Sequence, residues 1–271
     1  MSRKSRLNLP RDKKRRPRIP APENVAAIVF DADTGTRFIV TKDTLQNQLH
    51  RDGPIIRKSF DKLSAAHVAE CSAVLGGAHA LIIRNLGRGD TGYKTTAARL
   101  IWYALRTYMA SIEVARHGYR RPYGVLARSV LETIATVVSI AIHPGTLEKF
   151  HAGTLQSTKC ITSAKAVFPP LGSYYRMLSE EFVHIGKQHG ALEELSYSSD
   201  DPALPFILGT LRANAWMIYV VAELVFFDNL TQPRYWVPLS GGRLAYAPSE
   251  SERAWMAEFL QAADDDAYAA P

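Results

Sequence analysis

The chain has 271 residues, of which 46% are apolar and 22% charged, as in an ordinary globular protein that can bury a sizeable core. Its two cysteines, Cys71 and Cys160, exclude a disulfide framework and a cysteine-ligated zinc site, and they favour a reduced, cytoplasmic setting. The net charge of +7 is concentrated at one end, because residues 1–20 sum to +8 whereas residues 248–271 sum to −5.

The distribution of apolar residues argues against a membrane partner. No apolar run follows the basic N-terminus, so we do not expect a secretory signal. The two most apolar stretches, Thr133–Ile142 and Ala213–Ala222, hold about ten uncharged residues each, whereas a membrane span needs roughly 20. We therefore interpret both stretches as parts of buried helices.

The first 86 residues predict a tail, a hairpin and a long helix. Residues 1–22 combine the basic run with several prolines, and we predict a disordered basic tail. Residues 25–41 predict two short strands around a turn at Asp31–Thr36. The apolar spacing then predicts a helix from 60 to 86, with Ser59 as its N-cap.

The rest of the chain is predicted to be helical up to a second hairpin. The predicted helical segments are 95–117, 122–143, shorter pieces within 145–168, 173–185 and 204–230. Residues 234–248 predict a Gly-Gly hairpin, in which Pro238 is typical of an edge strand, and a polar helix follows at 249–263.

These elements predict a mainly α fold. We expect a bundle of about five long helices with short N- and C-terminal β-hairpins, which could pair into a small sheet. The predicted divisions are the tail (1–22), the helical bundle domain with its flanking hairpins (23–247) and a C-terminal helix with an acidic tail (248–271).

Asp31 and Asp33 follow a strand, as the two carboxylates of a haloacid-dehalogenase-type phosphotransferase do. That motif places Gly and Thr directly after the second Asp, whereas Thr34 intervenes here. The reaction also needs alternating strands and helices to supply magnesium ligands, and mostly helices follow. We favour a hairpin turn, with aspartyl-phosphate chemistry as the weaker alternative.

Two other motifs resemble ligand sites. Residues 87–96, GRGDTGYKTT, approach both a dinucleotide fingerprint and a P-loop, but no buried strand precedes them. We interpret them as a helix–helix connection whose amides, beside Lys94, could hold an anion. The Glu-x-x-His steps Glu148–His151 and Glu181–His184 have di-iron spacing but the wrong ligand order. We therefore expect neither a metal nor a cofactor.

The predicted helix over 120–143 carries an Arg–Glu pair on its polar stripe. Arg128 and Glu132 are four residues apart and can pair along the helix. One interpretation is an internal clamp between helices, which would need hydrogen-bonded partners. The other is that the pair faces a cleft.

Two segments together resemble a known family. LARSVLETIATV contains Arg128 and Glu132, and some forty residues later YYRMLSEEFVHIG contains His184. This pattern resembles uncharacterised bacterial proteins grouped with the HEPN-like helical bundles. The resemblance spans roughly residues 60–230 and implies a bundle in an RNA or defence context. The Arg, four to six residues, His spacing that active HEPN proteins use for RNA cleavage is absent, because seven residues separate Arg176 from His184.

The leading functional hypothesis is a cytoplasmic HEPN-like protein that contacts RNA or another polyanion. Any activity would be a metal-independent, ribonuclease-like cleavage, for which Arg128, Glu132 and His184 would have to converge. Candidate nucleic-acid contacts come from RHGYRRPYGVLAR and from the tail: Arg116, Arg120, Arg121, Lys14, Arg15 and Arg16. The alternative is a non-enzymatic interaction module that binds a protein partner or forms a homodimer through a helical face.

Overall fold

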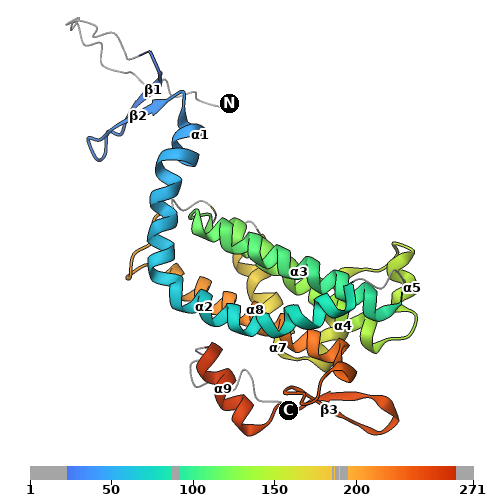
Figure 1. Cartoon of the computed structure of the whole chain (residues 1–271). Coiled ribbons are helices and arrows are strands. Elements are labelled where there is room, and N and C mark those ends of the chain that lie inside the picture. Colours follow the sequence, from blue (N-terminus) through green and yellow to red (C-terminus); the bar gives the residue numbers. More distant parts are fainter. Residues whose placement is uncertain (1–22, 87–91, 185, 187–188, 190–194, 261–271) are drawn as a thin grey trace, which may run out of the picture. The chain divides into compact units, whose positions relative to one another are not determined.

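The computed structural model describes residues 23–86, 92–184, 186, 189 and 195–260. The predicted tail (1–22) and the acidic end (261–271) lie outside these residues. The protein is mainly helical, with two small antiparallel strand pairs (Figure 1). Its contacts divide it into two units, Met1–Gly53 and Pro54–Pro271.

The first unit contains the predicted N-terminal hairpin. Strands β1 (Val25–Phe30) and β2 (Arg37–Thr41) pair antiparallel, and α1 (Thr44–Asn47) and the π-helical segment η1 (Gln48–Asp52) follow. β-Branched and aromatic residues dominate both strands, as suits an extended backbone. This prediction is confirmed.

The turn of this hairpin accounts for the two aspartates. The Asp31 carboxylate accepts hydrogen bonds from the Asp33 amide (3.0 Å) and the Thr34 hydroxyl (2.6 Å), and Gly35 adopts a φ of 68°. Bonds from Thr34 and Asp33 hold the pKa of the Asp31 carboxyl below its usual value. The flanking strands are antiparallel and exposed, whereas the phosphotransferase alternative needs a buried strand in an alternating strand–helix fold.

Four helices of more than 20 residues form most of the described part of the second unit. They are α2 (Gly53–Leu86), α3 (Tyr93–Arg116), α4 (Arg120–Ile142) and α8 (Ala203–Val225). The shorter helices are α5 (Thr146–His151), α6 (Ser157–Val167), α7 (Pro170–Leu178) and α9 (Glu250–Leu260). The helix expected over 173–185 is instead α7 followed by the π-helical segment η2 (Ser179–Val183).

Ser59 does not cap the long helix, because α2 begins six residues earlier at Gly53. Pro54 suits the first turn, where its missing N–H needs no partner. The Ser59 hydroxyl bonds within the helix to the Ile56 carbonyl (2.6 Å), and it accepts the Tyr197 amide (3.0 Å). Its role is to join α2 to the segment before α8.

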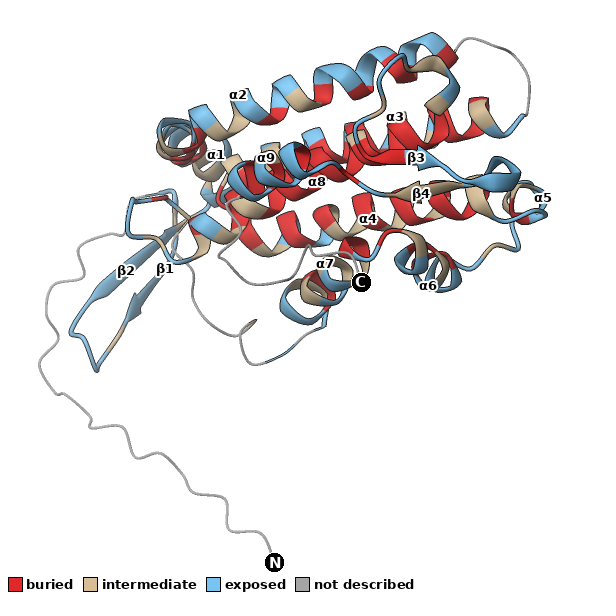
Figure 2. Ribbon diagram, turned by 90° about the horizontal axis from the view of Figure 1, so that it is seen from below, coloured by how far each residue is buried: buried red, intermediate tan, exposed pale blue. Residues whose placement is uncertain are grey.

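Helix α8 is the most buried long helix, and 18 of its 23 residues are buried (Figure 2). It packs against α3 and α4, which also pack against each other, and α6 and α7 cover another side of α4. Gly77 allows α2 to approach α8, because a Cβ there would lie 2.8 Å from the Tyr219 ring. The apolar residues of α8 point in all directions, as expected for a central helix.

The predicted Gly-Gly hairpin is also present. Strands β3 (Trp236–Pro238) and β4 (Leu244–Tyr246) pair antiparallel across a turn in which Gly241 and Gly242 have φ values of 75° and 72°. The two hairpins form separate two-stranded sheets and do not pair into one. The remaining 3-10 segments are η4 (Phe227–Asn229) and η5 (Ser240–Gly242).

Among the described residues, three helical stretches are long and apolar enough to cross a membrane, judged by length and composition alone. They are Thr44–Leu86, Arg120–Ile142 and Ala203–Val225, and 28%, 50% and 78% of their most apolar windows are buried within the protein. The uncharged runs Thr133–Ile142 and Ala213–Ala222 are shorter than the helices that contain them, α4 and α8. The absence of a membrane partner and the cytoplasmic location therefore stay predictions.

Candidate functional site

Arg128 and Glu132 form a pair on α4 that also holds a tyrosine of α7. The guanidinium of Arg128 lies 3.1 Å from Glu132, donates to the Tyr175 hydroxyl at 2.6 Å and lies 4.8 Å from the centre of that ring. The Tyr175 hydroxyl in turn donates to Glu132 at 3.3 Å. Each of the three side chains contacts the other two, so α4 and α7 are joined by a closed polar contact, the Tyr175 clamp.

The clamp is only half-buried. The side chains of Arg128 and Glu132 are 21% and 33% exposed, so water reaches both charges. The pair is therefore partly buried, as an internal clamp between helices would be, and it does not face an open cleft. The internal-clamp interpretation describes its contacts, because a second helix supplies the hydrogen-bonding partner.

A glycine positions the segment that follows α7. A Cβ at Gly124 would lie 2.0 Å from the Phe182 ring, so only glycine lets this ring pack directly on α4. Phe182 belongs to η2, and its ring also lies 5.2 Å from that of Phe206 on α8. The chain from α7 through η2 thus runs along α4, and we call this contact the α4–α7 seam.

One end of the seam is hollow. A cavity of about 510 Å³ is lined by Arg121, Pro122, Val125, Leu126, Phe182, Val183 and His189. Arg121 lies on the same side of α4 as Arg128, since the two are seven residues apart. The imidazole of His189 accepts the Gly186 amide at 3.0 Å, and this bond fixes the ring at the edge of the hollow.

His184 follows Val183 at the end of η2 but does not join the clamp. Its side chain is exposed, and its backbone amide ends η2 by donating to Ser179 at 3.1 Å. Within the described ranges, no hydrogen bond or ion pair links its imidazole to Arg128 or Glu132. The π-helical turn explains the placement, because it shifts later residues around the axis relative to the α-helix that the sequence predicts.

The predicted cluster of arginines is mostly occupied by carboxylates. Arg116 forms two 2.7 Å bonds to Asp61 and one of 2.5 Å to Glu113, and these partners raise the pKa of its guanidinium. Arg120 is 7% exposed and pairs with Asp201, so it is not on the surface where RNA would bind. The prediction for Arg120 was wrong because the sequence shows that the residue is charged but not that its side chain is buried. Arg121 is half-buried in the hollow.

The remaining candidate residues are the cations of the tail and the two Glu-x-x-His steps. Lys14, Arg15 and Arg16 lie outside the described residues. No group of three or more His, Cys, Asp or Glu side chains that could hold a metal occurs in the part of the chain that the structure describes. Glu148 and His151 lie on the short α5, while Glu181 and His184 lie on η2 and just after it.

Sequence reasoning missed two residues of the seam, Tyr175 and His189. Tyr175 precedes Leu178 by three residues in YYRMLSEE and so lies on the same, mostly apolar, face of the helix. Its hydroxyl, which needs a hydrogen-bond partner when buried, could have indicated a polar contact on that face. His189 lies beyond the predicted helix, in a segment without periodicity. Only the path of the chain after η2 brings it to Arg121.

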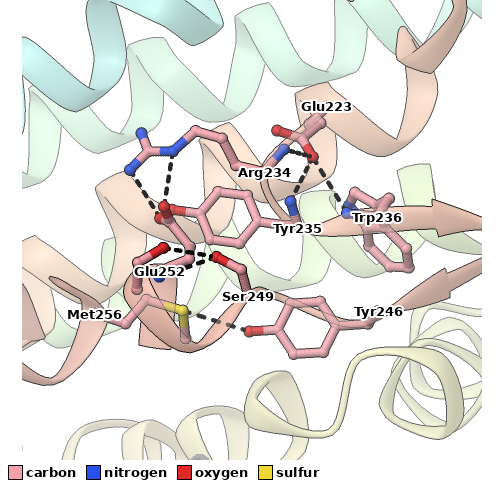
Figure 3. Close-up of polar contacts among 9 residues, drawn as sticks. Glu223, Arg234, Tyr235, Trp236, Tyr246, Ser249, Glu252 and Met256 are labelled. Atoms are coloured by element: carbon pink, nitrogen blue, oxygen red, sulfur yellow. Dashed lines mark hydrogen bonds and ion pairs between the residues drawn. The ribbon is translucent and has the colours of Figure 1, made fainter. Parts of the chain in front are cut away.

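A buried carboxyl group lies elsewhere, between α8 and β3. The buried Oε1 of Glu223 accepts the amides of Arg234 (2.8 Å), Tyr235 (2.6 Å) and Trp236 (3.2 Å), as Figure 3 shows. Burial raises the pKa of the Glu223 carboxyl, and the three amides oppose that rise. Its Oε2 is buried and has no hydrogen-bond partner among the described residues.

The same region carries a second charged contact. Arg234 forms a two-pronged ion pair with Glu252 of α9, at 2.9 and 2.8 Å (Figure 3). Its guanidinium also lies 4.9 Å from the centre of the Trp255 ring. The Glu223 and Arg234 contacts join α8, β3 and α9 to one another. This structural role accounts for the Glu223 pKa without a ligand.

No family model, curated protein or solved structure matches this chain. The HEPN-like resemblance therefore stays a hypothesis that rests on the two sequence motifs. The α4–α7 seam contains the residues of both motifs and is the candidate site.

Proposed function

We propose that this chain is a HEPN-like helical protein that contacts RNA or another polyanion through the α4–α7 seam. We further propose that it binds without cleaving, in the cytoplasmic and defence setting that the resemblance implies. The observation that carries the proposal is that both motifs contribute to one seam, with Arg121 and His189 lining a hollow at one end of it.

The side chains at this end suit a phosphate-bearing strand. Arginine and histidine donate to phosphate oxygens, and the apolar wall of Val125 and Phe182 can take the face of an unpaired base. The half-exposed Arg128 extends the cationic line along α4. Its ion pair with Glu132 limits the net positive charge of the seam. We therefore expect contacts with only a few phosphates, not the many that a wide basic surface would make.

The contacts of the candidate acid–base groups support binding without cleavage. A general base must lie within about 3 Å of the proton it removes, directly or through one water. Among the described residues, no hydrogen bond or ion pair joins His184 to Arg128 or Glu132, and both of those side chains already bond to Tyr175. The seam therefore offers positioned donors rather than a linked catalytic pair.

The test measures binding of a fluorescent single-stranded RNA to the full chain at several salt concentrations. Arg121→Met should weaken binding and reduce the slope of log affinity against log salt by about 1, as expected for one lost phosphate contact. Arg106→Met is the matched control, since it removes one exposed arginine from α3. Deletion of residues 2–20 measures the tail separately, because its charge gives non-specific binding that falls steeply with salt.

Three outcomes would contradict the proposed RNA binding, and a fourth would contradict the absence of cleavage. The first is an absence of RNA binding by the full chain. The second is equal loss of affinity in Arg121→Met and Arg106→Met, which would indicate a general charge effect. The third is complete loss of binding on deletion of residues 2–20, which would place the whole affinity in the tail. Cleavage of the RNA that disappears in His184→Ala would contradict binding without catalysis.

A further inference from the structure

The β1–β2 hairpin exposes apolar side chains on both of its faces. Cross-strand partners lie on the same face, so Ile28 and Ile39 share one face with Phe30, while Val29 and Phe38 lie on the other. A hairpin that packs on one core normally alternates apolar and polar residues. Here no face is polar.

These side chains are far more exposed than core residues. The exposed fractions are Ile28 58%, Val29 50%, Phe30 60%, Phe38 52%, Ile39 63% and Val40 41%. An isolated two-stranded hairpin is marginally stable in water, and it also leaves an unpaired edge on each strand. The hairpin therefore needs another surface for its stability.

The apolar surface continues into the helical segment of the same unit. Leu45 of α1 and Leu49 of η1 are 71% and 50% exposed. With the six strand residues they present on the order of 900 Å² of side-chain surface, whereas a standard interface buries some 800 Å² per partner. Because this area is divided between two faces, each face is comparable with the largest apolar patch on a typical monomer, roughly 300–600 Å².

We propose that a second copy of this chain covers the hairpin, so that the protein is a two-fold dimer through residues 25–49. In such a dimer one face of each hairpin packs on the partner's hairpin, and the other packs on the partner's Leu45 and the partner's Leu49. A two-fold axis makes the same apolar surface complementary to itself. The inference does not depend on the α4–α7 seam.

The composition of the hairpin argues against the other occupants. Between Val25 and Thr41 the only cation is Arg37, so the surface lacks the charges that bind nucleic acid. In a bilayer, both strand edges would leave amides and carbonyls without partners, and Asp31 and Asp33 would enter with them. A second polypeptide can satisfy the apolar faces while the carboxylates stay in water.

The test compares substitutions in the hairpin with a substitution at a similarly exposed position on α2. The full chain should sediment at twice the monomer mass, and replacing one residue on each face, as in the double variant Phe38→Thr and Ile39→Thr, should weaken self-association about 100-fold or more. Threonine keeps the preference for a strand. Ile83→Thr is the matched control, because Ile83 is 53% exposed on α2 and lies outside the proposed interface.

A second measurement covers the case in which the double variant loses its hairpin. In the unchanged protein, amide hydrogen exchange of residues 25–41 should slow as protein concentration rises, while exchange in α8 should not change. Self-association should persist at high salt, which separates it from polyanion binding.

Each contrary outcome identifies another arrangement. A monomer at all concentrations would overturn the dimer. Dissociation by Ile83→Thr but not by the hairpin variant would place the interface on α2. Binding of the monomer to phosphatidylglycerol vesicles, lost in the hairpin variant, would assign the surface to lipid.

Discussion

Two arginines of α4 make the same kind of contact at different depths. Arg120 lies 4.7 Å from the centre of the Tyr197 ring and pairs with Asp201. The two charged side chains of that pair are 8% and 10% exposed. Eight residues later, Arg128 repeats the arrangement close to the surface.

The second contact differs mainly in its access to water. Arg128 lies 4.8 Å from the centre of the Tyr175 ring and pairs with Glu132, and these charges are two to three times as exposed as those of the Arg120 pair. Surface ion pairs contribute little to stability because water screens them, whereas a buried charge without its partner is costly. The two arginines make the same contacts but differ in exposure. We therefore predict a structural role for Arg120 and a role in binding for Arg128.

The largest expected effect comes from the buried pair. Arg120→Met or Asp201→Leu alone should lower the free energy of unfolding by about 3–5 kcal/mol, because the remaining charge stays buried without its partner. The double variant should lose less than the sum of the two. Urea unfolding followed by circular dichroism measures all four proteins. Single losses below about 1 kcal/mol would show that this pair is solvated and would remove the contrast.

A smaller effect is expected for the half-exposed pair. Arg128→Met or Glu132→Leu should cost about 1 kcal/mol, since water can solvate the charge that remains. Tyr175→Phe keeps the ring and removes both hydroxyl bonds, so it tests the clamp without changing any charge. The same urea series applies, with the coupling energy taken from the double variant. A loss as large as that of Arg120→Met would mean that the clamp is energetically buried.

The smallest effect concerns the pH dependence contributed by Glu223. Burial raises its pKa above the ordinary value of 4.5, so the folded protein retains a proton that the unfolded chain loses first. This stabilisation is fully present below the unfolded pKa and is lost as pH rises through the folded pKa. Glu223→Gln keeps an oxygen for the three amides and cannot ionise.

The variant should therefore gain stability relative to the parent protein as pH rises from about 4 to 7. Urea midpoints of both proteins across that range measure the difference, and Glu258→Gln, at an exposed position on α9, controls for loss of a carboxylate. Parallel pH profiles for Glu223→Gln and the parent would show that this carboxyl titrates alike in the folded and unfolded chains.

Much of the helical architecture could be predicted because its signals are local. Apolar periodicity and Gly118 located α3 within two residues at its start and one at its end, and the Gly-Gly pair located the β3–β4 turn. The α4 prediction was equally close at its C-terminus, where Pro144 follows. Local rules failed at Ser59 and at η2, where tertiary contacts outweighed capping preference and helical phase.

The candidate site was only partly predictable, for a related reason. Helical spacing alone joins Arg128 to Glu132, and the structure has that ion pair. The contact of this pair with Tyr175 depends on how α7 packs on α4. The sequence separation between α4 and α7 does not reveal that packing. The separation of His184 from the pair depends on a π-helical turn that the sequence pattern did not indicate.

The sequence by itself determined the mainly helical class, both hairpins and the Arg128–Glu132 pair, because these follow from periodicity, turn residues and a four-residue spacing. The tertiary structure alone decided which charges are buried, since Arg120, Arg121 and Arg128 look alike in the sequence and differ in their surroundings. Exposure is a property of the packed chain. It depends on which elements meet, and here it separates a structural arginine from the arginines of a candidate site.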